Sequence, residues 1–141
     1  MRPSGASPGG AGPGPRVGVS THVLDTVTGE PASGIVVRLE AVGAGPASAG
    51  ELARATTDAD GRVGGFRTGR LAAGDYRLPA GDYRLVFETG PYLAAVHGEA
   101  ASGSAPFYPE VVVTFTADGA RPRYHVPLLL GPYSYTTYRG S

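Results

Sequence analysis

The sequence contains no cysteine. This absence excludes a disulfide framework, a cysteine-ligated zinc site and a thiolate nucleophile. An excess of one charge is also absent, because twelve basic and twelve acidic residues give a formal net charge of zero. The balance lacks the basic footprint that nucleic-acid binding requires, so no nucleic acid is expected as a partner. A small molecule or another protein is the expected partner.

Long apolar runs are absent as well. None reaches the length of a transmembrane helix, and the residues between Arg2 and Arg16 hold no apolar core of a signal peptide. We therefore expect a cytoplasmic protein with no membrane partner. Residues 1–16 contain nine glycine or proline residues and almost no large apolar side chain. Such a segment cannot bury enough surface to offset its ordering entropy, which predicts a disordered tail before one domain over 17–141.

Apolar and polar residues alternate with a period of two through most of this domain, which is typical of strands buried on one face. The runs cover 17–24, 35–40, 83–88, 111–116, 123–130 and 133–138. Turn residues such as Asp60-Gly61 and Asp118-Gly119 separate them. The pattern predicts an all-β protein, an antiparallel β-sandwich, with one short helix near 91–97.

Two of the three histidines are distinguished by the strand faces on which they lie. His22 lies opposite the valines of the first strand, and His125 points away from the apolar face of the strand over 123–130. Imidazole titrates near neutral pH, so such a pair suits the roles of general acid and general base. His97 has no such partner and is expected to be structural or solvated.

Other constellations of reactive residues are less specific. The histidines do not stand at metal-motif spacing, so no metal is expected. Ser20, His22 and Asp25 have the composition of a catalytic triad, but they follow one another on a single strand, whereas triads converge from separate segments. The segment at 58–61 resembles the start of a calcium loop but lacks the closing glutamate, which favours a plain turn.

Four segments together resemble the signature segments of 5-hydroxyisourate hydrolases in the transthyretin-like family. They lie at 20–25, 57–62, 124–130 and 133–141, the last ending in Tyr-Arg-Gly-Ser. This ending is similar to that of the hydrolases and differs from that of the hormone-carrying transthyretins. The sequence departs from the family pattern in its tail, in the loop at 43–50 and in a lengthened hairpin near 69–81, without loss of a motif residue.

The resemblance implies a transthyretin-like sandwich of about eight strands, assembled as a homotetramer with active sites between dimers. It implies hydrolysis of 5-hydroxyisourate, a product of urate oxidation, without a cofactor. The implied catalytic residues are His22, Arg62, His125 and Ser141, and the implied substrate-binding residues are Tyr138, Arg139 and Gly140. Either histidine suits the role of general base, and the arginine fork suits an anionic substrate or a developing oxyanion. The alternative is a non-catalytic carrier of a small ligand.

Overall fold

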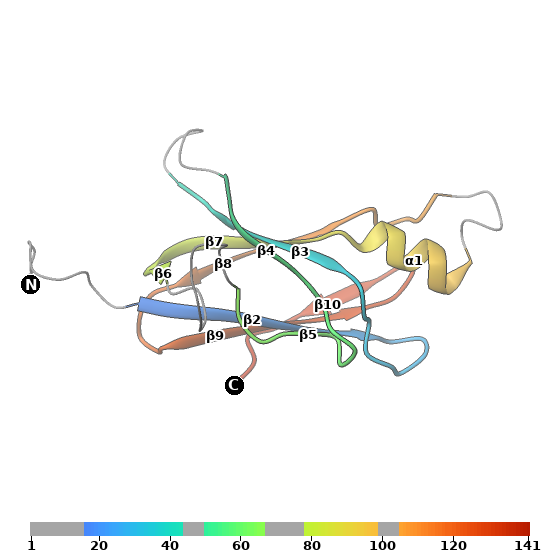
Figure 1. Cartoon of the computed structure of the whole chain (residues 1–141), viewed down its shortest axis with the longest axis horizontal. Helices are drawn as coiled ribbons and strands as arrows, with labels where there is room; N and C mark the ends of the chain where they lie inside the picture. The colour runs from blue at the N-terminus through green and yellow to red at the C-terminus, as the bar shows by residue number, and fades with distance from the viewer. Residues whose placement is uncertain (1–15, 44–49, 67–77, 99–104) are drawn as a thin grey trace, which may run out of the picture.

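The computed structural model describes residues 16–43, 50–66, 78–98 and 105–141, which form two stacked sheets with a helix at one end (Figure 1). The strands are β2 (Arg16–Asp25), β3 (Val36–Ala41), β4 (Gly50–Thr56), β5 (Arg62–Val63), β6 (Leu78–Pro79), β7 (Gly81–Phe87), β8 (Val111–Ala117), β9 (Arg123–Leu130) and β10 (Tyr135–Thr137). The helix is α1 (Thr89–His97). The expected β-sandwich with one short helix is confirmed.

One sheet has the order β10-β9-β2-β5, with β6 pairing separately with β2, and the other has the order β4-β3-β7-β8. All pairs are antiparallel except β2 and β9, which run parallel over eight residue pairs. Parallel strands need a long crossover, and here the whole second sheet provides it. The sheet is therefore mixed, whereas the sequence pattern predicted an antiparallel one.

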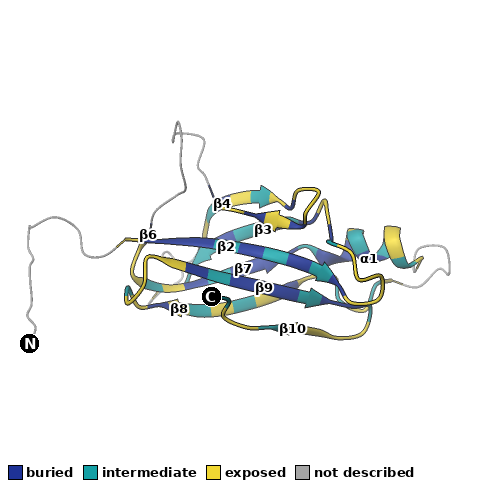
Figure 2. Ribbon diagram, turned by 90° about the horizontal axis from the view of Figure 1, so that it is seen from below, coloured by how far each residue is buried: buried dark blue, intermediate teal, exposed yellow. Residues whose placement is uncertain are grey.

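The core lies between the sheets and is built from the alternating residues that the sequence predicted to face inward. In the central pair of the first sheet they are Val17, Val19, Thr21 and Val23 of β2 and Tyr124, Val126, Leu128 and Leu130 of β9. All eight are at most 6% exposed. Figure 2 shows both strands side by side, with buried and partly buried residues along them. The opposite face of this pair carries Ser20, His22, Arg123 and His125 among glycine, leucine and proline residues.

Several boundaries differ from those that the sequence predicted. Strands β4, β5 and β6 were not predicted, because β4 is an edge strand with exposed charged residues and the other two have only two residues each. Helix α1 begins two residues earlier than expected, and β10 is shorter. Arg16, assigned to the tail, is the first residue of β2. The loop at 43–50 and the hairpin near 69–81 fall largely outside the described residues, as does the tail over 1–15.

The carboxylate of Asp25, which is fully buried at the end of β2, ties this strand to helix α1. It accepts hydrogen bonds from the backbone of Val27 and Thr28, from the Tyr92 hydroxyl at 2.8 Å and from His97 Nε2 at 2.7 Å. Burial alone would raise the pKa of Asp25, but these hydrogen bonds outweigh it and lower the pKa. His97 is therefore structural, and Asp25 is occupied away from any serine-based triad.

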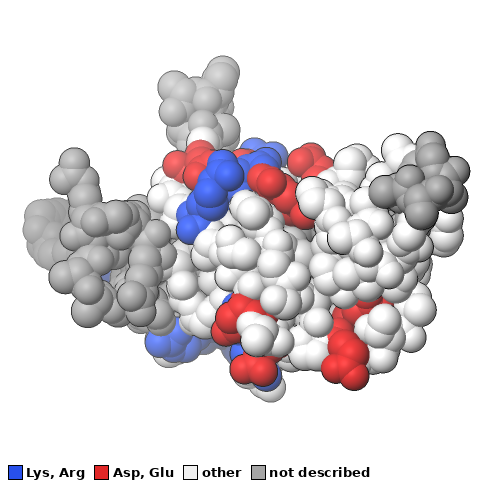
Figure 3. Space-filling model, turned by 45° about the vertical axis from the view of Figure 1, so that its right-hand side comes forward, with Lys and Arg blue, Asp and Glu red and all other residues white. Residues whose placement is uncertain are grey.

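Ion pairs gather on the outer face of the second sheet. They join Arg38 to Glu88 at 2.6 Å, Arg38 to Glu40 at 3.4 Å and Arg54 to Glu51 at 2.8 Å. Figure 3 shows blue and red side chains close together along the top of the molecule, above a largely uncharged flank. The Arg54–Glu51 pair is exposed and contributes little stability, whereas the side chains of Arg38, Glu40 and Glu88 are partly buried. In the described part of the chain, no helix is long and apolar enough to cross a membrane.

Candidate active site

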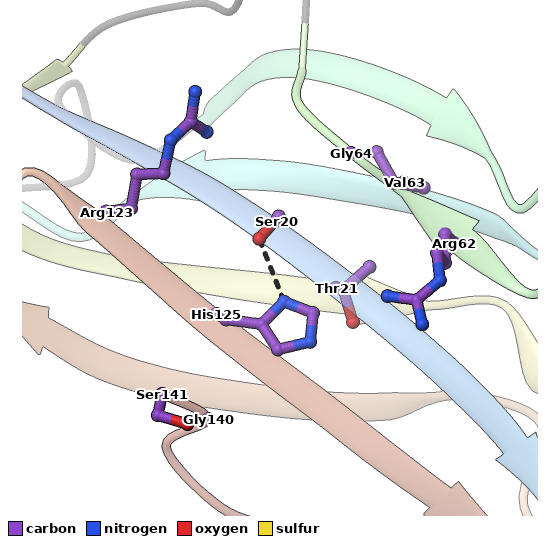
Figure 4. Close-up of a pocket in the computed structure, with 9 residues that line it drawn as sticks. All are labelled: Ser20, Thr21, Arg62, Val63, Gly64, Arg123, His125, Gly140 and Ser141. Carbon is purple, nitrogen blue, oxygen red and sulfur yellow. Dashed lines mark hydrogen bonds between the residues drawn. The ribbon is translucent and has the colours of Figure 1, made fainter.

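A pocket of about 370 Å³ opens on the outer face of the β2–β9 pair (Figure 4). It is lined by Ser20, Thr21, Arg62, Val63, Gly64, Arg123, His125, Gly140 and Ser141. These residues come from β2, from β5 and the glycine after it, from β9 and from the C-terminal segment, so both ends of the domain meet here. The volume falls within the range of small-molecule sites.

Strand register brings the predicted polar residues to this face. The parallel pairing sets Ser20 opposite His125, and the antiparallel pairing sets His22 opposite Arg62. Side chains of paired residues lie on the same side of a sheet, so His22, Arg62 and His125 share the outer face. His22 adjoins the pocket without being among the residues that line it.

A tight turn at 58–61 positions Arg62. The Asp58 side chain accepts hydrogen bonds from the backbone N–H groups of Asp60 and Arg62, both at 2.9 Å. Gly61 has a φ of 75°, and a Cβ there would lie 2.5 Å from the carbonyl oxygen of Val23, so only glycine fits. The pKa of Asp58 is lowered, chiefly by the hydrogen bond from the N–H of Arg62. The N–H of Asp60 and the charges of Arg62 and His22 lower it further. The segment is a turn, as the sequence predicted.

The C-terminal segment lies against β9, and its residues Gly140 and Ser141 form one wall of the pocket. The N–H of Gly140 donates a hydrogen bond to the carbonyl oxygen of His125 at 2.8 Å, and the Thr137 hydroxyl donates to that of Pro127 at 2.7 Å. A Cβ on Gly140 would lie 2.6 Å from His125 Cδ2. Glycine at this position therefore lets the backbone lie against the imidazole and brings Ser141 to the pocket.

Tyr138 and Arg139 line a different, apolar pocket of about 140 Å³. Its walls include Tyr124 and Val126 on the core side of β9 and Phe115 of β8. The segment after β10 follows the edge of β9, so its residues contact the core side before Gly140 reaches the outer face. Within this chain the structure thus separates Tyr138 and Arg139 from the other predicted site residues.

Burial and neighbouring charge keep His125 neutral near pH 7. Desolvation lowers the pKa of His125 below its ordinary value of 6.5, and the charges of Arg62 and His22 lower it further. Its Nδ1 lies 2.8 Å from the hydroxyl oxygen of Ser20. A neutral imidazole with one nitrogen engaged and the other directed to the pocket is suited to accept a proton.

Five pocket residues were not predicted as part of the site, and Ser20 and Arg123 are the two of them with polar side chains on the outer face; the others are Thr21, Val63 and Gly64. Ser20 was considered only as a triad nucleophile, although it shares a strand face with His22. Arg123 shares the outer face of β9 with His125, and this parity was the signal that pointed to it. With Arg62 it gives the pocket two guanidinium groups, which favour an anionic ligand. Among the described residues, no three His, Asp or Glu side chains are grouped to hold a metal ion.

Strand order and pocket together define the class of protein as a transthyretin-like β-sandwich, as solved structures show. The structure of Klebsiella pneumoniae 5-hydroxyisourate hydrolase matches with a TM-score of 0.65 and 35% identity, covering 88% of this chain and 99% of that one. The crystal structure of transthyretin from Sparus aurata matches with a TM-score of 0.66 and 30% identity, covering 86% and 95%.

The chain belongs to the HIUase/Transthyretin family, whose model matches residues 19–140. It is 41% identical over 124 residues to the 5-hydroxyisourate hydrolase of Mus musculus, covering 87% of this chain and 94% of the relative. It is also 41% identical over 128 residues to that of Caulobacter vibrioides, covering 88% and 98%. The resemblance found in the sequence motifs is confirmed.

Proposed function

We propose that this chain hydrolyses 5-hydroxyisourate to 2-oxo-4-hydroxy-4-carboxy-5-ureidoimidazoline, a step of urate catabolism. The observation that carries the proposal is the convergence of His125, Arg62 and Ser141 on one pocket. The curated relatives that match most of the chain are named for this activity. A carrier needs no neutral imidazole beside a guanidinium, so the pocket chemistry favours the enzyme over the small-ligand carrier.

His125 acts as the general base. It takes a proton from water through Nε2 while the water oxygen bonds to a ring carbonyl carbon. The carbon–nitrogen bond of the ring then breaks, and the leaving nitrogen receives the proton that His125 took from the water, which restores the neutral imidazole. His125 is preferred to His22 for this role because it lines the pocket and its pKa is lowered by burial, Arg62 and His22.

Arg62 and Ser141 complete the arrangement. The guanidinium of Arg62 is charged at any working pH, so it stabilises the oxyanion that forms on the attacked carbonyl oxygen. Ser141 provides a hydroxyl and the terminal carboxylate, either of which orients the water. No metal is needed, because the neutral imidazole generates the nucleophile and the arginine stabilises the charge.

The reaction is tested by generating 5-hydroxyisourate from urate in the cuvette and following its ultraviolet decay. We expect catalytic amounts of the protein to accelerate the decay well above the spontaneous rate. His125→Gln protein at the same concentration is the matched control. Decay at the spontaneous rate would rule out the hydrolase, and saturable binding of the compound without faster decay would identify the carrier.

The pH dependence of kcat/KM should report the lowered pKa of His125. The base form is active, and desolvation, Arg62 and His22 all oppose protonation, so activity should rise through an acidic limb below pH 6.5 and be level at neutral pH. Arg62→Gln removes one opposing charge, so the limb should move to higher pH. Arg121→Gln, on an exposed turn, is the control and should leave the limb in place. If the acidic limb lies at the same pH in Arg62→Gln as in the wild type, His125 is not the general base.

We propose further that the chain assembles as a homotetramer. Aromatic side chains are exposed beside β10, with Phe107 65%, Tyr133 72% and Tyr135 40% exposed. Phe107 and Tyr108 pack edge to face with ring centroids 4.9 Å apart, and Tyr108 packs in the same way on Tyr135 at 5.1 Å. Together with β8 and β10 at the sheet edges, this cluster offers a surface suited to bury against another copy.

A further inference from the structure

The imidazole of His125 is held on two sides by residues that are distant in the sequence. Nδ1 faces the Ser20 hydroxyl at 2.8 Å, and the backbone of Gly140 lies so close to Cδ2 that a Cβ could not be placed there. Figure 4 shows Nδ1 turned toward Ser20 and the other ring nitrogen turned into the pocket. The ring therefore has little freedom to rotate, and its two nitrogens have different environments.

We infer that Ser20 is a positioning residue that holds His125 in the tautomer with the proton on Nδ1, leaving the lone pair of Nε2 open to the pocket. The inference rests on the proposed hydrolase function, because only a base needs that lone pair. Ser20 lines the pocket, and its hydroxyl is engaged with the ring of His125. It acts through the ring that it orients.

Strand pairing makes this contact rigid. Ser20 and His125 are 105 residues apart in sequence but are register partners within the parallel β2–β9 pair. On each side of them the inward residues are buried, and the Thr21 hydroxyl donates a hydrogen bond to the carbonyl oxygen of Val126 at 2.6 Å. The distance between the hydroxyl and the ring is thus set by the backbones of two core strands.

The charges around His125 determine which of the two neutral tautomers its imidazole adopts in this hydrogen bond. A serine hydroxyl can donate or accept, so the bond alone permits both. The charged or titratable groups around the ring are Arg62 from β5, His22 from β2, Arg123 from β9 and the terminal carboxylate of Ser141. The guanidinium of Arg62, which acts on His125, attracts a nitrogen lone pair and repels an N–H, whereas that of Arg123 extends away from the ring (Figure 4). Nε2 therefore carries the lone pair toward the pocket, and Nδ1–H donates to Ser20 Oγ.

The tautomer can be measured without substrate, by nitrogen-15 NMR of His125 in the folded wild-type protein at a pH above its pKa. We expect Nδ1 to be protonated and Nε2 to be bare. Ser20→Ala removes the acceptor and should move the proton partly to Nε2. Ser20→Thr keeps a hydroxyl and should show the wild-type tautomer. Ser134→Ala removes an exposed hydroxyl elsewhere and should not change the tautomer of His125.

Kinetics provide the second readout. Ser20→Ala should lower kcat roughly 10- to 100-fold with little change in KM, the scale for a residue that orients a catalytic group, and Ser20→Thr should recover most of it. A wild-type protein with its proton on Nε2, or a Ser20→Ala protein with unchanged tautomer and kcat, would overturn the inference. An inactive wild type whose His125 is protonated on Nδ1 would instead count against the hydrolase and leave the positioning intact.

Discussion

We expect His125→Gln to lower kcat/KM for 5-hydroxyisourate by roughly 10²- to 10⁴-fold, the usual contribution of a general base. Glutamine fills similar space and forms hydrogen bonds but takes up no proton at neutral pH, so the loss reports proton transfer rather than packing. His125 is half-buried on the outer face of β9, so the substitution leaves the core residues untouched. Initial rates of ultraviolet decay measure the effect, and circular dichroism checks the fold.

His22→Gln separates the two histidines that the sequence left equal. His22 pairs with Arg62 but does not line the pocket, so this variant should lose less activity than His125→Gln. It should also keep the acidic limb of the pH profile. The limb should move to slightly higher pH, because the charge of His22 no longer lowers the pKa of His125. If His22→Gln abolishes the limb and His125→Gln retains it, the roles of the histidines are reversed.

The second large effect is expected from the C-terminus. Deleting residues 138–141 should reduce turnover to near the spontaneous rate, because it removes the pocket wall formed by Gly140 and Ser141 and one side of the support of His125. Light scattering and circular dichroism should show an unchanged mass and fold, since β10 ends at Thr137. A truncated protein with full activity would assign this segment to packing alone.

Two smaller changes separate the contributions of residues within this segment. Deleting only residues 140–141 should be as damaging as the longer deletion, because Tyr138 and Arg139 line the other pocket. Gly140→Ala keeps the full length and the terminal carboxylate but forces a Cβ against the ring of His125. It should cost at least about tenfold in kcat, since small displacements of a catalytic group are costly. A fully active Gly140→Ala protein would show that the imidazole needs no support on this side.

Strand faces could be predicted from the sequence, and the pairing of distant strands could not. Alternation placed Val17 and Tyr124 inside and His22 and His125 outside, and the burial of these strands confirms it. Nothing in the alternation indicates that β2 and β9 run parallel or that Ser20 stands opposite His125. Register depends on contacts between segments about a hundred residues apart, which one sequence does not reveal.

The C-terminal tetrapeptide shows the same limit. Its sequence singled out residues 138–141 as one unit through family resemblance. In the structure the unit is split, because Tyr138 and Arg139 contact the apolar pocket while Gly140 and Ser141 reach the polar one. The need for glycine at 140 becomes visible only with the position of the His125 ring, since its φ lies outside the left-handed region that usually marks a required glycine.

The parallel pairing of β2 with β9 also has a consequence for how the protein folds. A contact between segments 105 residues apart closes a very large loop, so its entropic cost must be met before the pairing stabilises anything, and high contact order slows folding. During synthesis β2 emerges first, and its apolar side chains remain exposed to solvent until its main partner, β9, has been synthesised. A nascent chain that stops short of Arg123 has neither a closed core nor a site.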